Sequence, residues 1–415
     1  MKRVSNEPDF PVNNKDFFNQ IPSSWKWASL GDISEITIGK SPEGCYTTDD
    51  SSYTGLIGGA SDMGNVCPVI TRYTKKPVYL CQKNDVILAI RATIGRVNIA
   101  DDSYCLGRGV ASIRSEKIDS RFLMYYFQYA KEYFVNIATG ITFMQISKRD
   151  LSRMLIPLPP LEEQVRIVRK VADAFGKLEQ ASEIVEQAKK EYEDMRSYFL
   201  KQAFSGKLTE AWRKEQEIDR GGWKKKRFEE VASVNTTIIN SENLRHEEIP
   251  YITPGNIEKN TGKLLAYGNL KDKNLNGGMH SFSKNEILYA RRNPEFSRVT
   301  IASFSGVCSP EIFTIQVKGN VRYLYYYMLS DYFLKQLLRV NPSLERVNKE
   351  QLKRIEVEMP DSEEQEKIVQ LLDSVFVKEK EIYELMNVME DIEKIKESIL
   401  AKAFQGKLTE VDIER

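Results

Sequence analysis

Leu161-Glu-Glu-Gln-Val-Arg-Ile-Val168 opens a stretch that runs to Ala203-Phe-Ser-Gly-Lys-Leu-Thr-Glu210, and the chain contains this stretch twice. It returns as Ser362-Glu-Glu-Gln-Glu-Lys-Ile-Val369 through Ala403-Phe-Gln-Gly-Lys-Leu-Thr-Glu410. The second copy begins 201 positions after the first and closes 200 positions after it, so one residue is dropped between. A repeat of this length predicts a protein built as two equivalent halves.

Each copy is predicted to form one long helix. A proline lies just before both copies, where it suits the first turn of a helix, and in the second copy Ser362 and Gln365 have the spacing of a capping box. Both copies close at a glycine, Gly206 and Gly406, which can adopt the left-handed conformation that ends helices. At about 1.5 Å per residue, each helix would be a rod of roughly 65 Å.

The first helix carries an apolar stripe, and the second carries a looser version of it. The stripe consists of Leu161, Val165, Val168, Ala172, Phe175, Ala181, Val185, Ala188, Tyr192, Met195 and Phe199. Such a stripe packs on another helix. The first helix delivers the chain to the block that the second helix leaves, so a paired arrangement is antiparallel. We expect one globular block at each end, an approximate two-fold axis between them, and the last residues near the first block.

The composition is that of a soluble globular protein, with 41% hydrophobic and 29% charged residues among 415. No stretch approaches the roughly 20 apolar residues that span a bilayer, and the N-terminus lacks the apolar run of a signal peptide. We therefore expect a cytoplasmic protein with no membrane partner. The five cysteines form no CxxC pair and there are two histidines, so we expect no metal and no cofactor.

The net charge of +1 conceals an uneven distribution. Residues 23–158, the first block, hold 16 basic against 13 acidic side chains, and residues 222–360, the second block, hold 21 against 15. Residues 361–415 hold 8 basic against 15 acidic side chains. The positive excess therefore lies in the two non-helical blocks, where a polyanion could be met.

Both blocks contain alternating apolar runs that are typical of strands. They lie at 85–91 and 96–100 in the first block and at 286–291 and 298–302 in the second, with Gly, Pro and Asn turns between. Each block then offers a short aromatic helix, at 122–126 and at 323–327. We interpret these aromatic side chains as packing core rather than as platforms for stacking bases.

The end of the first block carries the most specific local signature. Ala138-Thr-Gly-Ile-Thr142 and Ile146-Ser-Lys148 precede Ile156-Pro-Leu-Pro-Pro-Leu-Glu-Glu-Gln164, and the helix exit Phe204-x-Gly-Lys-Leu208 follows. With these motifs the chain resembles the specificity (S) subunit of type I restriction–modification systems over nearly its whole length. The second block departs from the signature at Asn341-Pro-Ser343 and Pro360-Asp-Ser362, while the repeat stays intact.

The resemblance implies an α+β fold. It would comprise two α/β target-recognition domains separated by two long antiparallel coiled-coil helices, with pseudo-two-fold symmetry. The expected parts are an N-terminal segment at 1–22, recognition domains at 23–158 and 222–360, a spacer helix with linker at 159–221, and a second spacer helix at 361–415.

The resemblance also implies a function without chemistry in this subunit. Each recognition domain would read one half of a split sequence in double-stranded DNA, and the helices would act as a spacer. Two methyltransferase (M) subunits would dock on it, joined by two restriction/translocase (R) subunits for cleavage. Apart from the resemblance, two related domains that both enter the major groove would read half-sites about one helical turn apart, roughly 34–36 Å.

Direct readout needs side chains such as Arg on guanine and Asn or Gln on adenine, projected from loops. The candidates for DNA binding are Arg91, Arg96, Arg291, Arg292, Asn293 and Arg298, with Lys40, Arg108, Lys273 and Lys284 as phosphate contacts. We match the turn at 91–96 with the turn at 291–298. Polar glycine-rich loops at 58–65 and 253–260 could approach DNA closely. For each charged residue, a solvated surface charge or a fold-bracing pair is the competing interpretation.

Two other classes of function stay open. A coiled-coil adaptor that joins two proteins without reading DNA would suit the apolar stripe and the acidic segment at 361–415. An enzyme is the second class, but Gly39-Lys-Ser41 is only the tail of a phosphate loop, because Ser34 occupies the place of its first glycine. Asn293-Pro-Glu-Phe296 resembles the Asn-Pro-Pro-Tyr/Phe motif of adenine-amino methyltransferases, without a convincing cofactor loop upstream. We therefore expect no catalytic residue.

Overall fold

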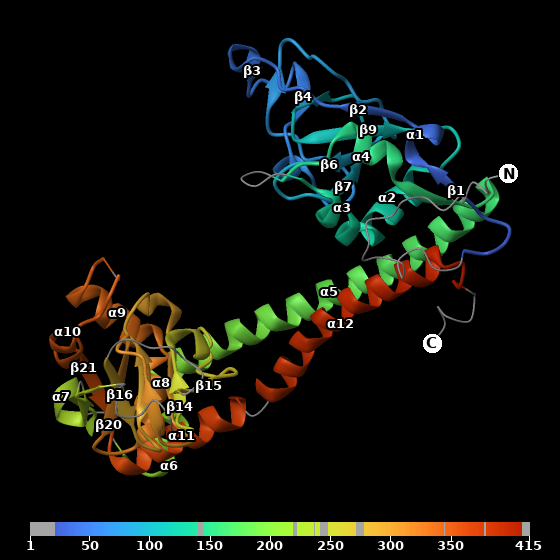
Figure 1. Ribbon diagram of the computed structural model, residues 1–415. Coiled ribbons are helices and arrows are strands. Elements are labelled where there is room, and N and C mark those ends of the chain that lie inside the picture. The colour runs from blue at the N-terminus through green and yellow to red at the C-terminus, as the bar shows by residue number, and fades with distance from the viewer. Residues whose placement is uncertain are drawn as a thin grey trace. The chain divides into compact units, whose positions relative to one another are not determined.

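The computed structural model describes residues 21–139, 144–218, 222–235, 237–240, 248–270, 278–343, 345–376 and 379–408. The chain divides into two compact units. Unit 1 comprises Met1–Val185 and Met386–Arg415, and unit 2 comprises Glu186–Leu385. Each unit therefore combines one block with part of both repeats (Figure 1). No helix in the described part of the chain is both long and apolar enough to cross a membrane.

Unit 1 is built on two four-stranded sheets, in the orders β2-β9-β6-β7 and β3-β5-β4-β8, and a pair β1-β10. The strands are β1 Lys26–Ser29, β2 Glu35–Ile38, β3 Thr47–Thr48, β4 Thr54–Ile57, β5 Tyr73–Thr74, β6 Val86–Ala89, β7 Val97–Ile99, β8 Cys105–Leu106, β9 Val110–Arg114 and β10 Leu155–Leu158. The helices are α1 Leu30–Ile33, α2 Ser120–Tyr129, α3 Lys131–Ile137, α4 Lys148–Arg153 and the first part of α5 Leu161–Phe204.

Unit 2 has the corresponding sheets β12-β20-β17-β18 and β13-β16-β19-β14-β15, and a pair β11-β21. The strands are β11 Lys224–Arg227, β12 Ala232–Asn235, β13 Ile238–Asn240, β14 Pro250–Ile252, β15 Gly268–Asn269, β16 Gly278–Phe282, β17 Ile287–Ala290, β18 Val299–Ile301, β19 Gly306–Cys308, β20 Ile312–Val317 and β21 Glu356–Met359. The helices are α6 Glu210–Glu215, α7 Phe228–Val231, α8 Val321–Met328, α9 Asp331–Val340, α10 Lys349–Lys353 and α11 Ser362–Phe376, and α12 Glu379–Phe404 begins here.

The predicted strands form, but one inner strand of each main sheet, β6 in unit 1 and β17 in unit 2, is buried on both faces. In β6, Val86 and Leu88 join the core that includes α2, whereas Ile87 and Ala89 join a second core under the other sheet. All four residues of β17 are likewise buried. Successive side chains of β6 therefore enter two different hydrophobic cores, one on each face of the sheet, instead of alternating between a core and solvent.

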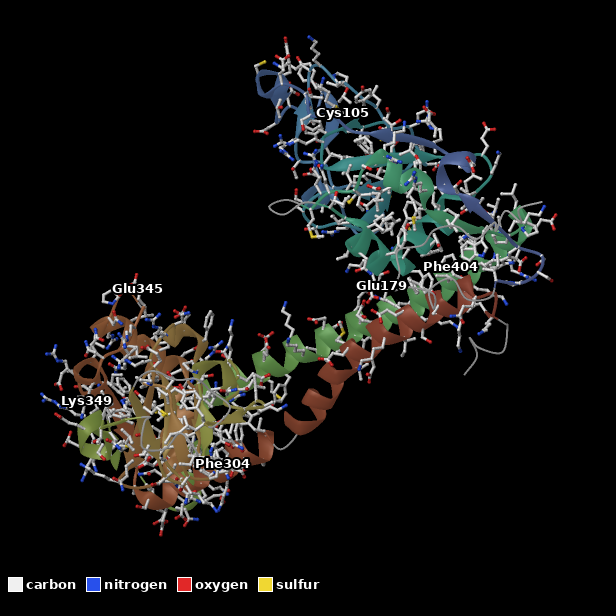
Figure 2. All side chains as sticks on the ribbon, viewed as in Figure 1. Cys105, Glu179, Phe304, Glu345, Lys349 and Phe404 are labelled. Carbon is white, nitrogen blue, oxygen red and sulfur yellow. The ribbon has the colours of Figure 1, made fainter. Side chains whose placement is uncertain are left out.

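The two aromatic helices are packing core, as predicted. In unit 1 the ring of Phe404, at the end of α12, meets the rings of Phe122 and Tyr126 of α2 with centroids 5.2 and 5.1 Å apart; Phe404 is labelled in Figure 2. In unit 2 the ring of Phe204, at the end of α5, meets those of Tyr323 and Tyr327 of α8 at 5.5 and 5.3 Å. The end of the second repeat thus packs on the first block, which confirms the predicted return of the chain.

The predicted helix exits are confirmed. Helix α5 ends at Phe204 and α12 at Phe404, and Gly206 and Gly406 follow with φ of 74° and 68°. These angles lie in the left-handed region that glycine enters without a steric penalty. Where Gly406 lies, a Cβ would come within 2.1 Å of Pro22, so the site admits no larger residue without rearrangement.

The helix of the second repeat differs from its prediction at its start. It is described as α11 and α12, and the predicted continuity between them falls on residues 377–378, which lie outside the described residues. Its cap is Asp361 rather than Ser362, because the Asp361 carboxylate accepts a 2.8 Å hydrogen bond from the Glu364 N–H. The Gln365 amide donates to the Pro360 carbonyl at 2.8 Å. A carboxylate one position earlier serves the free N–H groups of the first turn, so Ser362 is already helical.

The apolar stripe is also displaced at the start of α5. Leu161 and Val165 are 53% and 49% exposed, whereas Gln164, Ile167 and Val171 are buried. The first turns of α5 face the first block, so that block decides which side is covered. Gln164 is covered because its amide is satisfied: its oxygen accepts from the Asp119 N–H at 2.8 Å, and its nitrogen donates to the Pro159 carbonyl at 2.9 Å.

Candidate nucleic-acid interface

Four of the predicted contact residues meet at one end of the main sheet of unit 1. The strands β2, β9, β6 and β7 pair antiparallel, with Ile38 opposite Ala111 and Ala89 opposite Val110. The end of β2, the start of β9, the end of β6 and the start of β7 therefore share one edge. We call this edge the unit 1 rim; its charged residues are Lys40, Arg91, Arg96 and Arg108, all exposed.

Close backbone contacts between glycines hold the loops of the unit 1 rim together. The Gly109 N–H donates to the Gly58 carbonyl at 3.2 Å, which brings the polar loop at 58–65 to the rim. A Cβ on Gly39 would lie 2.2 Å from the Gly107 oxygen, so any side chain there would force these strands apart. The Arg108 N–H donates to the Ser41 hydroxyl at 3.2 Å. The glycines thus serve close approach of the chain to itself, and the cations project around them.

Arg96 and Arg298 brace the same loop in the two units. Arg96 donates to the Ala60 carbonyl at 3.3 Å, and Arg298 donates to the Pro254 carbonyl at 3.1 Å. The two acceptors belong to the polar loops at 58–65 and 253–260. Arg298 is half-buried and Arg96 is exposed. Both arginines therefore have a structural role of the fold-bracing kind, and Arg96 keeps part of its guanidinium available to solvent.

The turns at 91–96 and 291–298 follow the corresponding strands β6 and β17, but their first arginines do not correspond. The Ile90 N–H donates to the Gly109 carbonyl, and the Arg291 N–H donates to the Glu311 carbonyl, each at 2.9 Å. Arg291 therefore stands where the buried Ile90 stands in unit 1, and Arg292 is the counterpart of Arg91. The extra residues in the loop at 291–298 hide this register in the sequence.

Arg291 is held inside unit 2. Its guanidinium lies over the Phe313 ring at 4.7 Å, and its Nε donates to the Val347 carbonyl at 3.2 Å. Burial lowers the pKa of Arg291, and the neighbouring Arg346 and Arg292 lower it further, against the opposing effect of Glu311. Arg291 is thus a half-buried cation that supports the neighbouring chain.

Arg292 and Asn293 lie exposed at the corresponding edge of unit 2, together with two residues that the sequence analysis missed. Arg292 Nε donates to Glu311 Oε2 at 3.1 Å, and Arg346 donates to Glu311 Oε1 at 2.8 Å. Arg292 and Arg346 also face each other in an antiparallel backbone bridge. We call Arg292, Asn293, Glu311 and Arg346 the unit 2 rim. No spacing in the sequence signals Glu311 or Arg346, because the fold brings them together from different loops.

The last two candidates do not join the rim. Lys284 precedes β17 and Arg291 follows it, so Lys284 lies at the opposite end of the strand from the unit 2 rim. Lys273 lies outside the described residues. Within the described ranges, no group of three or more His, Cys, Asp or Glu side chains is placed to hold a metal ion.

A protein-family model described as the type I restriction modification DNA specificity domain matches the chain twice, over residues 22–190 and 220–387. Among curated proteins, the putative type I restriction enzyme MjaX specificity subunit of Methanocaldococcus jannaschii is 34% identical over 42% of this chain. The chain spans 43% of the length of that relative. The type I restriction enzyme EcoDI specificity subunit of Escherichia coli is 24% identical, over 94% of this chain and 90% of the relative.

A solved structure from work on complex assembly and conformational transition of the type I R-M system superposes with a TM-score of 0.68. It covers 94% of this chain and all of the other chain at 18% sequence identity. At this identity the likeness concerns the fold, and it extends over both units.

Proposed function

The chain belongs to the family of type I restriction modification DNA specificity proteins, and from this membership we propose that units 1 and 2 each read one half of a bipartite DNA target. A specificity subunit is the non-catalytic component of its restriction–modification complex. Reading is therefore a matter of binding: side chains at the two rims meet base edges and phosphates, and a partner carries out the methyl transfer.

The observation that carries the proposal is the agreement between the two family matches and the two rims. Each match spans one block, and each block gathers loop cations at one end of its main sheet. None of Lys40, Arg91 and Arg108 forms an ion pair with another described residue. Cations left open on a rim suit phosphate and base contacts, because both are rich in acceptor atoms. We propose Lys40, Arg91, Arg96 and Arg108 as contacts of unit 1, and Arg292 and Asn293 as contacts of unit 2.

Proteins of this kind bind DNA and associate with methyltransferase and restriction subunits. We propose a complex with two M subunits and two R subunits, one of each for either unit. The exposed apolar residues of the repeat helices support docking there, because such residues are costly on a free surface; they include Leu161, Val165, Ile184, Tyr198, Val388 and Ile395. We further propose the division into recognition domains at 23–158 and 222–360, spacers at 159–221 and 361–415, and an N-terminal segment at 1–22.

The test is a methylation assay on random duplexes with the full-length chain and its methyltransferase partner. We expect a motif of two short specific base sequences, which we call the words of the target, separated by a gap of constant length whose bases are not recognised. Affinity should fall steeply with salt, by roughly 10³–10⁵ between 50 and 200 mM if 6–10 phosphates are contacted. A contiguous motif would overturn the proposal, and so would a complex without DNA affinity, which the adaptor interpretation predicts.

Exchange of residues 23–158 for the first block of a relative assigns the words to the units. We expect one word to change while the other word and the gap stay the same. A change in both words would contradict separate reading by the two units.

A further inference from the structure

The unit 2 rim holds more positive charge than its single carboxylate balances. Arg291, Arg292 and Arg346 surround Glu311, and the side chains of Arg292 and Arg346 are 65% and 46% exposed. Like charges that face each other across paired strands destabilise the pair, and Arg292 faces Arg346 in the bridge. One arginine paired with Glu311 would be enough to hold these loops together. The second cation therefore indicates a ligand rich in hydrogen-bond acceptors.

Glu311 orients both arginines and leaves their outer donors open. Each carboxylate oxygen takes one N–H, from Arg292 Nε at 3.1 Å and from a terminal nitrogen of Arg346 at 2.8 Å. The two terminal nitrogens of Arg292 form no hydrogen bond with another described residue. Two parallel N–H groups of one guanidinium match the O6 and N7 acceptors of guanine.

The backbone beneath the arginines is tied on both sides. The Asn293 N–H donates to the Glu345 carbonyl at 3.3 Å, and the Val347 N–H donates to the Arg291 carbonyl at 2.7 Å (Glu345 is labelled in Figure 2). Asn293 has a φ of 49°, in the left-handed region that asparagine tolerates better than most residues. The loop is therefore held in one path, which reduces the entropy lost when its side chains bind.

Unit 1 has the same backbone arrangement at its rim but carries different side chains there. Arg91 bridges Gln145 where Arg292 bridges Arg346, and Gly109 stands where Glu311 stands. Arginine suits guanine, whereas glutamine suits adenine. Two of the three matched positions thus differ between the units, Gln145 against Arg346 and Gly109 against Glu311, as two different target sequences require, while the backbone geometry is shared.

On the basis of the proposed function, we propose that Arg292 and Arg346 read guanine in the word of unit 2, and that Glu311 is the positioning residue that holds their guanidinium groups. Arg346 adds a base-reading residue, and Glu311 a positioning residue, to the contacts already proposed for this unit. Unit 1 reads its word at the same place of this backbone arrangement through Arg91 and Gln145.

The experiment uses the full-length chain with its methyltransferase partner and a duplex library randomised over both words. Arg346→Gln gives unit 2 the residue that unit 1 has at the matching position, Gln145, and Arg292→Gln removes the second guanidinium. We expect guanine preference at one or two positions of the unit 2 word to fall on the order of tenfold or more in each variant, with a gain for adenine. The unit 1 word should be unchanged, which shows in the same reaction that the complex has assembled.

Glu311→Gln tests the positioning role. We expect a smaller loss of preference at the same positions, and no further loss when Glu311→Gln is added to Arg292→Gln/Arg346→Gln, because the carboxylate acts only through the arginines. Lys284→Gln is the matched control: it removes an exposed cation of unit 2 at the other end of β17, and both words should persist.

Three results would separate the possible failures. A uniform loss of affinity with unchanged base preference would make the arginines phosphate contacts and overturn the inference. A unit 2 word without guanine would overturn it as well, and both results leave the proposed function standing. If the unaltered complex methylates no two-word target, the proposed function itself fails.

Discussion

Glu163 and Glu364 hold the same place in the two repeats, yet only Glu364 is buried. Its side chain, 2% exposed, pairs with Arg213 and accepts hydrogen bonds from the Thr209 hydroxyl at 2.6 Å and the Trp223 indole at 2.8 Å. The Glu163 side chain is 24% exposed, and its ion pair with Arg166 spans 3.4 Å. The same local sequence thus starts two helices whose junctions are held by different forces.

The difference comes from the connecting chain after the first repeat. Thr209, Arg213 and Trp223 lie on the stretch that leads from α5 into the second block, so the covalent chain brings them to Glu364. In unit 1 the indole nitrogen of Trp25, the residue that matches Trp223, is buried and has no hydrogen-bond partner among the described residues. The positions that match Thr209 and Arg213 fall at 409 and 413, outside the described residues. The starts of the two repeat helices are therefore held by different contacts, although the repeats match in sequence, because the connecting chain that follows each repeat differs.

The largest expected effect is on the buried pair of unit 2. Arg213→Met leaves the Glu364 carboxylate buried without its cation, and we expect a loss of about 3–5 kcal/mol in the stability of unit 2. Hydrogen exchange on peptides of each unit measures this separately, because a two-unit chain does not unfold in a single step.

Arg166→Met is the matched control in unit 1, where the pair is exposed and worth about 0–1 kcal/mol. The double variant Arg213→Met/Glu364→Gln should recover part of the loss, since it removes both buried charges. Equal losses in Arg166→Met and Arg213→Met would show that the two junctions are held alike.

A second comparison concerns the residue before the cap of each aromatic helix. Ile118 is buried in the core of unit 1, whereas Gly319 of unit 2 lines a cavity of about 460 Å³, and a Cβ at Gly319 would meet nothing within 4 Å. We expect Ile118→Ala to destabilise unit 1 by about 2–5 kcal/mol. Gly319→Ala should stabilise unit 2 by about 0.4–1 kcal/mol, because it restricts the unfolded chain without a clash.

Denaturant unfolding followed by unit-specific hydrogen exchange checks both signs. This position holds a buried side chain in unit 1 and no side chain in unit 2. The changes in stability of Ile118→Ala and Gly319→Ala should therefore have opposite signs. A destabilising Gly319→Ala would mean that the cavity is not open as the structure has it.

The smallest effect separates the thiols of the two blocks. Cys45 of the first block is exposed, whereas Cys308 of the second block is buried, and burial, with a further contribution from Glu286, raises the pKa of its thiol from 9.0 to about 12. Alkylation at pH 8 should modify Cys45 and spare Cys308, since the thiolate is the reactive form. Mass spectrometry of the labelled peptides measures both rates, and denaturant should make them similar.

The same shift predicts a dependence of stability on pH. The folded pKa of Cys308 lies above its unfolded value, so the folded state keeps a proton that the unfolded state releases. This contribution is fully present below about pH 9 and is lost as the pH rises toward 12. Rapid labelling of Cys308 in the folded chain would contradict both expectations.

The sequence alone determined the two-part plan of this protein. The repeat, its glycine exits and the aromatic helices are local patterns, and local patterns decide where helices begin, end and show an apolar face. The family signature at the end of the first block is likewise read directly from neighbouring residues. These features survive in the structure because each depends on residues within a few turns of one another.

Only the tertiary structure decided which charges are free. Arg91 and Arg292 are exposed, Arg291 stacks on Phe313, and Arg298 braces a loop, although all are arginines in similar turns. The fate of each depends on partners far away in the sequence, and long-range pairing leaves no local spacing. For the same reason the sequence did not show that Arg346 joins Glu311, that Asp361 caps α11, or that Leu161 faces away from the core.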